Sequence, residues 1–311
     1  PAFSYRCMAW SHSVKTKNKL DKLRRLHSLI LKTMAPKRAS TPIAGMEMIT
    51  YLPPLELYLR GEAIKAYIRN KHLLPPTWDG RPTGARTGEG HIRALARLAK
   101  EHDIPEMSWD KTEEVMHNFE PLYRVNTASF DRGNDAIKNN AILCYTDGSK
   151  QEDGGTGSGF YVMQTDAKGE PDPIDQASFQ LAPHNTVYQA EVTAITKAAD
   201  HLAKCQEAPG GAHIISDSRS ALQALQKHVT TSKTLQKCIR SLDALATKTS
   251  VTLHWIKAHV GHHGNEKADA LANAGARNKP DDHNPLTQVE EVPAPYSHLT
   301  HLVEEATESK W

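Results

Sequence analysis

The spacing of apolar residues changes near residue 141, and this change constrains the fold more than any other feature of the chain. Apolar runs at 141–145, 157–164 and 174–181 are short and are separated by glycine-containing turns, so they predict three consecutive strands. After residue 185 helical spacing alternates with further short strands. The resulting order, βββαβααβα, predicts an α/β domain with its strands first and its α/β units later.

The second half of this pattern has well-marked elements. Helical spacing and short apolar runs predict helices at 186–203, 218–228, 232–247 and 264–277 and strands at 213–216 and 251–256. Gly154-Gly155 is predicted to turn the chain between the first two strands. No Gly-Lys-Ser/Thr follows the glycine-rich run at 154–159, so we interpret that run as a flexible hairpin and not as a nucleotide-binding loop.

The first 140 residues predict a mainly helical region. Helical spacing is clear at 12–35 and 55–72, a shorter helix begins after Pro42, short helices are expected in 91–120, and an approach strand and turn in 121–139. The tail is acidic and rich in proline, a composition typical of disorder. We therefore expect a basic helical region at 1–75, a linker with short helices at 76–140, the α/β domain at 141–278 and a disordered tail at 279–311.

Charge is distributed unevenly along the chain. Residues 1–100 hold 19 Lys and Arg against 6 Asp and Glu, although the whole chain has a net charge of only +2. Lys15, Lys19 and Lys22 fall on one side of the first predicted helix, opposite much of its leucine stripe. This pattern predicts that the front of the chain contacts nucleic acid phosphates, and a solvated basic surface is the equal alternative.

The cysteines and the hydropathy indicate an intracellular protein with no membrane partner. The four cysteines show no CxxC spacing, so they are interpreted as reduced thiols and not as a disulfide framework or a zinc site. No run approaches the roughly 20 apolar residues of a membrane span. Nucleus and cytoplasm are not distinguished by these features.

Four carboxylates are predicted to converge. Asp147 ends the first strand and Asp217 ends the fourth, and ligands of open α/β sheets collect beyond strand ends. Glu191 and Asp269 lie early in the two helices that can point back at these ends. Carboxylates repel one another, so their convergence predicts divalent cations between them and a site that cuts phosphodiesters. His259, on the loop before Asp269, is the candidate for proton transfer or product release.

Each of these signals has a plain structural alternative when taken singly. An Asp-Gly pair after a strand is usually a turn, a helix Glu usually faces solvent, and Ser216-Asp217-Ser218 fits an N-cap. A zinc site among His254, His259 and the following histidines is disfavoured because no cysteine lies near. The order and joint occurrence of the four carboxylates carry the hypothesis.

These residues also carry a family resemblance. Residues 141–278 resemble a type 1 ribonuclease H domain of the kind fused to reverse transcriptases. The match rests on Thr146-Asp147-Gly148-Ser149, Ala190-Glu191, Ser216-Asp217-Ser218, and the block from Trp255 through His259, Gly261, Asn265 and Asp269 to Ala272. The resemblance implies a ribonuclease H-like five-stranded mixed sheet with flanking helices.

The same resemblance implies an activity and its site. The chain would be an endonuclease that hydrolyses the RNA strand of RNA–DNA hybrids with two Mg²⁺ ions, for which Mn²⁺ could substitute. Asp147 would bridge the ions, Asp269 would join the ion that activates water, and Glu191 and Asp217 would serve the other. The expected hybrid contacts are Gly148, Ser149, Gln189 and Asn265. The basic protrusion of the cellular enzymes is missing between Asp217 and His259.

The front of the chain resembles, more loosely, the region after the polymerase palm of non-LTR retrotransposon reverse transcriptases. The segments that carry this similarity are 23–30, 44–47 and 52–57. No aromatic-x-Asp-Asp sequence occurs. The resemblance therefore implies a C-terminal fragment without the polymerase palm, with the polymerase part of a longer polyprotein as a partner.

Two other functions compete with the hybrid nuclease. A DDE-type transposase or integrase shares the fold, but that class lacks the first-helix Glu and the His-Gly-Asn-Asp block. A catalytically inactive retroelement relic would act only as a nucleic-acid-binding module. Magnesium-dependent cleavage of a labelled hybrid distinguishes these alternatives.

Overall fold

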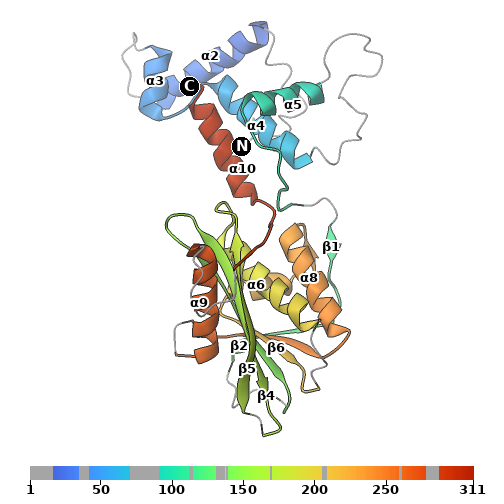
Figure 1. The fold of residues 1–311 in the computed structure, drawn as a ribbon. Helices are drawn as coiled ribbons and strands as arrows, with labels where there is room; N and C mark the ends of the chain where they lie inside the picture. Colours follow the sequence, from blue (N-terminus) through green and yellow to red (C-terminus); the bar gives the residue numbers. More distant parts are fainter. Residues whose placement is uncertain are drawn as a thin grey trace. The chain divides into compact units, whose positions relative to one another are not determined.

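The computed structural model describes residues 17–34, 42–70, 91–111, 115–130, 137, 139–168, 170–204, 209–258, 261–277 and 287–311. The chain forms two compact units, which Figure 1 draws by sequence colour. Pro1–Met107 and Tyr296–Trp311 make up the helical unit, and Ser108–Pro295 make up the sheet unit. No helix in the described ranges has the length and apolar character that a membrane crossing requires.

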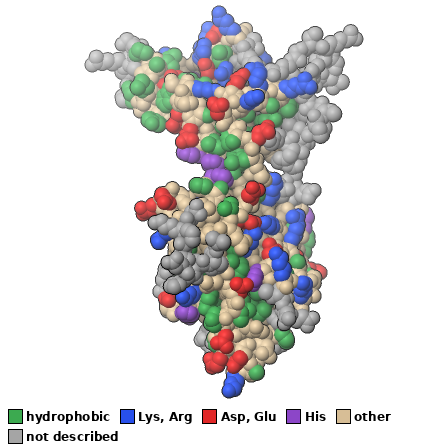
Figure 2. Space-filling model, in the orientation of Figure 1, with side chains coloured by type: hydrophobic (Ala, Val, Ile, Leu, Met, Phe, Trp, Pro, Cys, Tyr) green, Lys and Arg blue, Asp and Glu red, His purple; other side chains and the backbone are tan. Residues whose placement is uncertain are grey.

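The helical unit contains α2 (Lys17–Met34), α3 (Ile43–Thr50), α4 (Leu55–Asn70), α5 (His91–Glu101) and α10 (Tyr296–Glu308). The helices expected near 12–35, 42 and 55–72 are confirmed over their described residues. Their contacts include a buried ion pair of 3.2 Å between His27 Nδ1 and Glu47 Oε1. Lys and Arg side chains are prominent on these helices in Figure 2. Arg24 is held by Glu56 at 2.8 and 3.0 Å, so one of the basic side chains has an internal partner.

The predicted disorder of the tail is wrong over its described part. Residues 287–311 contain the short strand β9 (Gln288–Val289) and the helix α10. Leu299 and Val303, one helical turn apart, are buried, and α10 packs on α4. The prediction of disorder rested on the acidic, proline-rich composition, which does not reveal this short apolar face. The helix that covers the face lies more than 200 residues away in sequence.

The sheet unit is built on a seven-stranded mixed sheet with the order β2-β8-β6-β3-β4-β5-β9. Strands β3 (Ile142–Lys150), β4 (Thr156–Thr165) and β5 (Pro171–Leu181) pair antiparallel, and β6 (Ala212–Ser216) and β8 (Val251–Trp255) extend the sheet in parallel from β3. These are the five expected strands. The expected strand number is too low, because β2 (Arg124–Ser129) and β9 add one edge each from outside 141–278.

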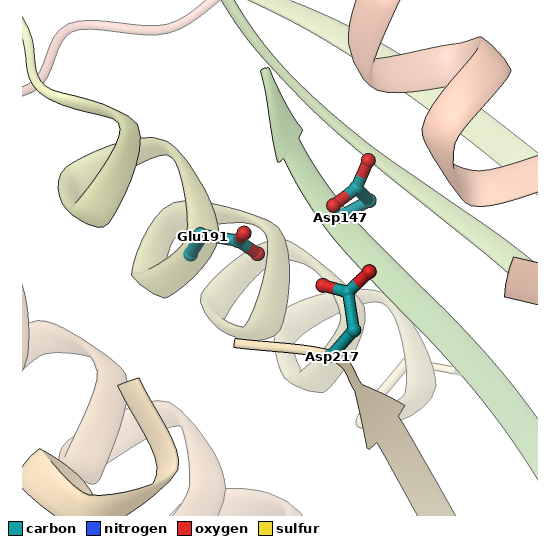
Figure 3. Close-up of side chains that lie close together, drawn as sticks. All are labelled: Asp147, Glu191 and Asp217. Carbon is teal, nitrogen blue, oxygen red and sulfur yellow. The ribbon is translucent and has the colours of Figure 1, made fainter. Parts of the chain in front are cut away.

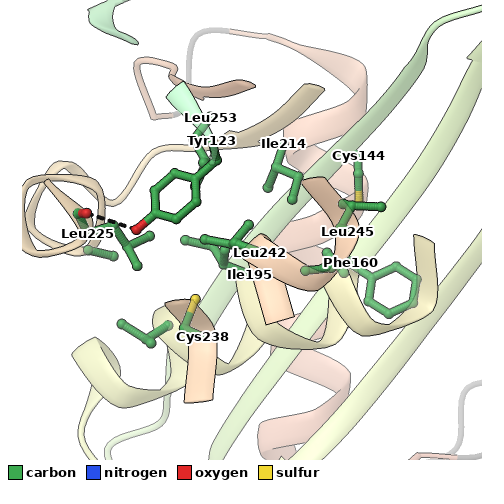
Figure 4. Packing of buried hydrophobic residues seen from close by; sticks show 14 of the residues in the cluster. Tyr123, Cys144, Phe160, Ile195, Ile214, Leu225, Cys238, Leu242, Leu245 and Leu253 are labelled. Atoms are coloured by element: carbon green, nitrogen blue, oxygen red, sulfur yellow. Dashed lines mark hydrogen bonds between the residues drawn. The ribbon is translucent and has the colours of Figure 1, made fainter. Parts of the chain in front are cut away.

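Helices cover both faces of this sheet. In β3, Ile142 and Cys144 face the core formed with α6 (Val187–Leu202), α7 (Arg219–Leu225) and α8 (Lys233–Ala246), whereas Leu143 and Tyr145 face α9 (His263–Arg277). Figure 1 shows α9 on one side of the sheet and α6 and α8 on the other. Figure 4 shows the larger core, where the Tyr123 hydroxyl donates to the Leu225 carbonyl at 3.0 Å.

Two segments outside the expected domain bounds complete the sheet unit. The backbone of Asp110 donates to the Ala294 carbonyl at 2.8 Å, and that of Ala294 donates to the Ser108 carbonyl at 2.7 Å. The Asp110 carboxylate accepts from Thr234 at the start of α8, and Glu290 is within 2.8 Å of Lys237 on the same helix. The compact unit is therefore 108–295 and not 141–278. This unit also contains a separate two-stranded antiparallel sheet, β1 (Met116–His117) with β7 (Val229–Thr230).

Candidate metal site

Three neighbouring elements deliver three carboxylates to one place. Asp147 lies within β3, where it pairs with Gly159 of β4; the strand continues to Lys150, so the expectation that Asp147 ends it is wrong. Asp217 directly follows β6, whose last residue, Ser216, pairs with Thr146. Glu191 lies in the second turn of α6, which packs on β3. The prediction that these side chains meet is confirmed.

The three carboxylates form a compact oxygen cluster. Figure 3 shows Asp147, Glu191 and Asp217 directed at one another, and each offers an oxygen within 4.8 Å of the other two. Asp147 is 6% exposed and Glu191 is 7% exposed. Glu191 Oε2 is buried and has no hydrogen-bond partner. Buried, partly unsatisfied carboxylate oxygens are the hard ligands that Mg²⁺ and Ca²⁺ prefer, so the residues fit a divalent cation.

Without a cation this cluster resists ionisation. Burial, followed by the charges of Asp217 and Asp269, raises the pKa of Asp147 from 3.8 to about 8. Burial, followed by Asp147 and Asp217, also raises the pKa of Glu191 well above its usual value. The backbone N–H of Gly148 donates to both carboxylates and opposes the two shifts. A divalent cation would reverse them by stabilising the charged forms.

The fourth predicted carboxylate, Asp269, reaches the same site from the other face. It lies in the second turn of α9 and shares a hydrogen bond with Asp147, but it is not part of the three-carboxylate cluster. Asn273, one turn later, donates to Asp269 Oδ1 at 3.1 Å. Asn273 itself accepts hydrogen bonds from Ser149 at 2.6 Å and from Gln151 at 2.8 Å. Asn273, held by Ser149 and Gln151, therefore restrains one oxygen of Asp269.

Two glycines bring the helices that carry Glu191 and Asp269 close to the strands. A Cβ atom at Gly148 would lie 2.4 Å from the backbone nitrogen of Glu191, and one at Gly159 would lie 2.6 Å from that of Ala272. Neither backbone can yield without moving its helix. The interpretation of Asp147-Gly148 as a turn is therefore wrong. The hairpin predicted at Gly154-Gly155 is confirmed, but the rest of the glycine-rich run, 156–159, belongs to β4. The turn itself contains Gly154, with φ of 92°.

The residues predicted to contact the hybrid differ in where the structure places them. Gln189 is 2% exposed; it forms the capping box of α6 with Thr186, and its amide donates to the Pro293 carbonyl at 2.9 Å. It cannot reach a ligand in this arrangement, so that prediction is wrong. Ser149 donates to Asn273, and Asn265 donates to Asp217 Oδ2 at 3.2 Å, so both lie at the site and hold other residues. His259 lies outside the described residues.

The supporting roles of two residues were not predicted from the sequence. Asn273 stands four residues after Asp269, on the same helix face, and this spacing was a signal available in the sequence. Trp255 donates its indole N–H to the Asp217 carbonyl at 3.0 Å. That contact joins residues 38 positions apart in sequence, so no local sequence pattern predicts it.

Comparison with known proteins finds relatives that are similar to this segment. Residues 139–277 match the family model of RNase H. Ribonuclease H of Tropheryma whipplei is 29% identical over 155 residues, covering 46% of this chain and 88% of that protein. Ribonuclease H of Ralstonia nicotianae is 58% identical over 36 residues, covering 12% of this chain and 24% of that protein.

Two solved structures are also similar. RNase H1 of Halobacterium salinarum has a TM-score of 0.34 at 20% identity, covering 45% of this chain and 99% of that one. The N-terminal RNase H domain of a Mycobacterium tuberculosis protein has a TM-score of 0.35 at 19% identity, covering 44% and 94%. The RNase H family model thus matches residues 139–277, a segment that folds as α/β structure with a mixed sheet and flanking helices.

Proposed function

We propose that the ribonuclease H domain of this chain is an active endonuclease that hydrolyses the RNA strand of RNA–DNA hybrids with two divalent cations. The observation that supports this most strongly is the buried cluster of Asp147, Glu191 and Asp217, with one Glu191 oxygen unsatisfied. The cluster lies within the segment that matches the RNase H family. Mg²⁺ is the proposed ion, with Mn²⁺ as a substitute, because the ligands are all carboxylate oxygens.

The chain's own residues prepare the site for these ions. When bound, two divalent cations supply an activated water and neutralise the leaving oxygen. Asp147 must lose its proton for the ions to bind, and its raised pKa couples binding to pH. Asn265 restrains Asp217, and Asn273 restrains Asp269, so the outer carboxylates keep their orientation. His259 is proposed to transfer a proton or assist product release.

The wider context is also part of the proposal. The relatives named Ribonuclease H support an RNA–DNA hybrid as the substrate. The likeness of the front to retrotransposon reverse transcriptases supports an origin in such an element, with the polymerase part as partner and an intracellular location. The excess of Lys and Arg in residues 1–100 supports phosphate contacts by the front.

Cleavage of end-labelled substrates tests this function. We expect the protein to cut the RNA strand of a hybrid in Mg²⁺ and to leave single-stranded RNA and double-stranded DNA intact. EDTA and the variant Asp147→Asn are each expected to nearly abolish cutting. Hybrid binding without cutting would instead support the inactive binding module, and attack on double-stranded DNA would support a transposase or integrase. Near-normal activity of purified Asp147→Asn would refute the two-cation site.

A further inference from the structure

Arg219 lies next to the carboxylate site, and the N–H donors of its guanidinium form no hydrogen bond with the described part of the protein. It is the first residue of α7, it is exposed, and it stands two positions after Asp217. Within the described part of the chain, no carboxylate forms an ion pair with its guanidinium and no oxygen accepts a hydrogen bond from it. A cation beside a cluster of acids would be expected to pair with one of them, so its position needs another explanation.

The guanidinium is held in place by an aromatic ring. Its central carbon lies 4.1 Å from the centroid of the Trp255 ring, a cation–π contact. This contact uses no N–H donor of the guanidinium, so its N–H groups, which lie in the guanidinium plane, remain available to a ligand. The side chain is therefore oriented before any ligand arrives, which lowers the entropy lost on binding.

The same ring is tied to a ligand of the metal site. The Trp255 indole and the Arg219 backbone both donate to the Asp217 carbonyl, each at 3.0 Å. Trp255 is fixed in addition by the pairing of β8 with β6, in which it stands opposite Ser216. The guanidinium is thus positioned relative to the backbone of Asp217, with no flexible segment between them.

We infer that Arg219 is a phosphate-binding residue for the nucleic acid strand that enters the carboxylate site. This inference rests on the proposed nuclease function and adds a substrate contact to it. A planar guanidinium with free in-plane donors matches the oxygens of a phosphodiester, and a fixed position beside Asp217 places it along the strand being cut. The contact is independent of sequence, because phosphates carry no base information.

Binding measurements test this role in the Asp147→Asn background, where the hybrid survives. Arg219→Ala is expected to weaken binding of a labelled RNA–DNA hybrid by about tenfold and to reduce the slope of log K against log salt by about 1. Arg219→Lys should keep the salt slope, because the positive charge remains. It should lose part of the affinity, because an ammonium group lacks the paired N–H donors of the guanidinium. Lys168→Ala removes an exposed charge at the β4–β5 turn and serves as the matched control.

The outcomes separate this inference from the nuclease proposal. If Arg219→Ala and Lys168→Ala have equal effects on affinity and slope, Arg219 is not a specific phosphate contact, although the nuclease proposal stands. If the unsubstituted chain binds the hybrid in an Arg219-dependent way but does not cut it, the nuclease proposal fails and the contact stands. Absence of hybrid binding by the Asp147→Asn protein refutes both.

Discussion

Without bound metal, the carboxylate cluster should destabilise the folded protein at high pH. Asp147→Asn should therefore raise the free energy of unfolding under these conditions. The pKa of Asp147 rises from 3.8 to about 8 on folding. A carboxyl group with a raised pKa in the folded state causes no loss of stability below the unfolded pKa. The loss grows as pH rises from about 4 to about 8 and is complete above that, because the unfolded chain ionises first.

The magnitude follows from this interval. At about 1.4 kcal/mol per pKa unit, a shift from 3.8 to about 8 corresponds to an upper limit of about 6 kcal/mol. Water entry and proton sharing with Glu191 lower the net cost, so we expect Asp147→Asn to raise the free energy of unfolding by about 2–4 kcal/mol at pH 9. At pH 4 the two proteins should differ by less than about 1 kcal/mol.

Urea unfolding in EDTA at pH 4 and pH 9, followed by circular dichroism, measures this difference. Asp172→Asn, which neutralises an exposed carboxylate on β5, is the control and should show no gain at either pH. Saturating Mg²⁺ should reverse the order at pH 9, because the cation stabilises the folded protein that retains all its carboxylates. A variant that is equally stable or less stable than the parent at pH 9 in EDTA would refute the repulsion argument.

Three further predictions concern the enzyme. His259→Ala should slow hybrid cleavage by roughly 10²-fold without abolishing it, as measured in single-turnover assays; a loss as complete as that of Asp147→Asn would contradict a proton-transfer role. Asn273→Ala should raise the Mg²⁺ concentration needed for half-maximal cleavage by about tenfold or more, by releasing Asp269, and unchanged Mg²⁺ dependence would argue against this restraint. The isolated sheet unit, 108–295, should bind the hybrid more weakly than the full chain and with a shallower salt dependence if the basic front contacts phosphates, whereas equal binding would leave those charges as a solvated surface.

The sequence alone determined the central architecture and the main acidic residues. The alternation of apolar residues with period 2 and then 3.6 follows from the geometry of strands and helices. The nine predicted elements of the α/β domain therefore match, in type and order, the elements from β3 to α9 other than the two-residue strand β7, which was not predicted. The four carboxylates could be singled out because each stands in a local setting that places it near a strand end or a helix start. Local spacing was sufficient for both predictions.

Tertiary structure decided the edges of the sheet unit and the surroundings of the carboxylates. β9 pairs with β5 across more than 100 residues, and Asp110 caps α8 from a segment assigned to the linker. Gln189, expected at the substrate, is buried: it forms the capping box of α6 with Thr186, and its amide donates to the Pro293 carbonyl. These features depend on contacts between distant segments, which no periodicity in a single sequence encodes.

The glycines show most directly why sequence was insufficient. Gly148 and Gly159 were interpreted as a turn residue and a part of a flexible hairpin, because glycine commonly serves those roles. In the structure they are strand residues that leave room for the backbones of α6 and α9. Whether a glycine is present for its backbone freedom or for its missing side chain depends on what packs against it, and only the folded chain supplies that neighbour.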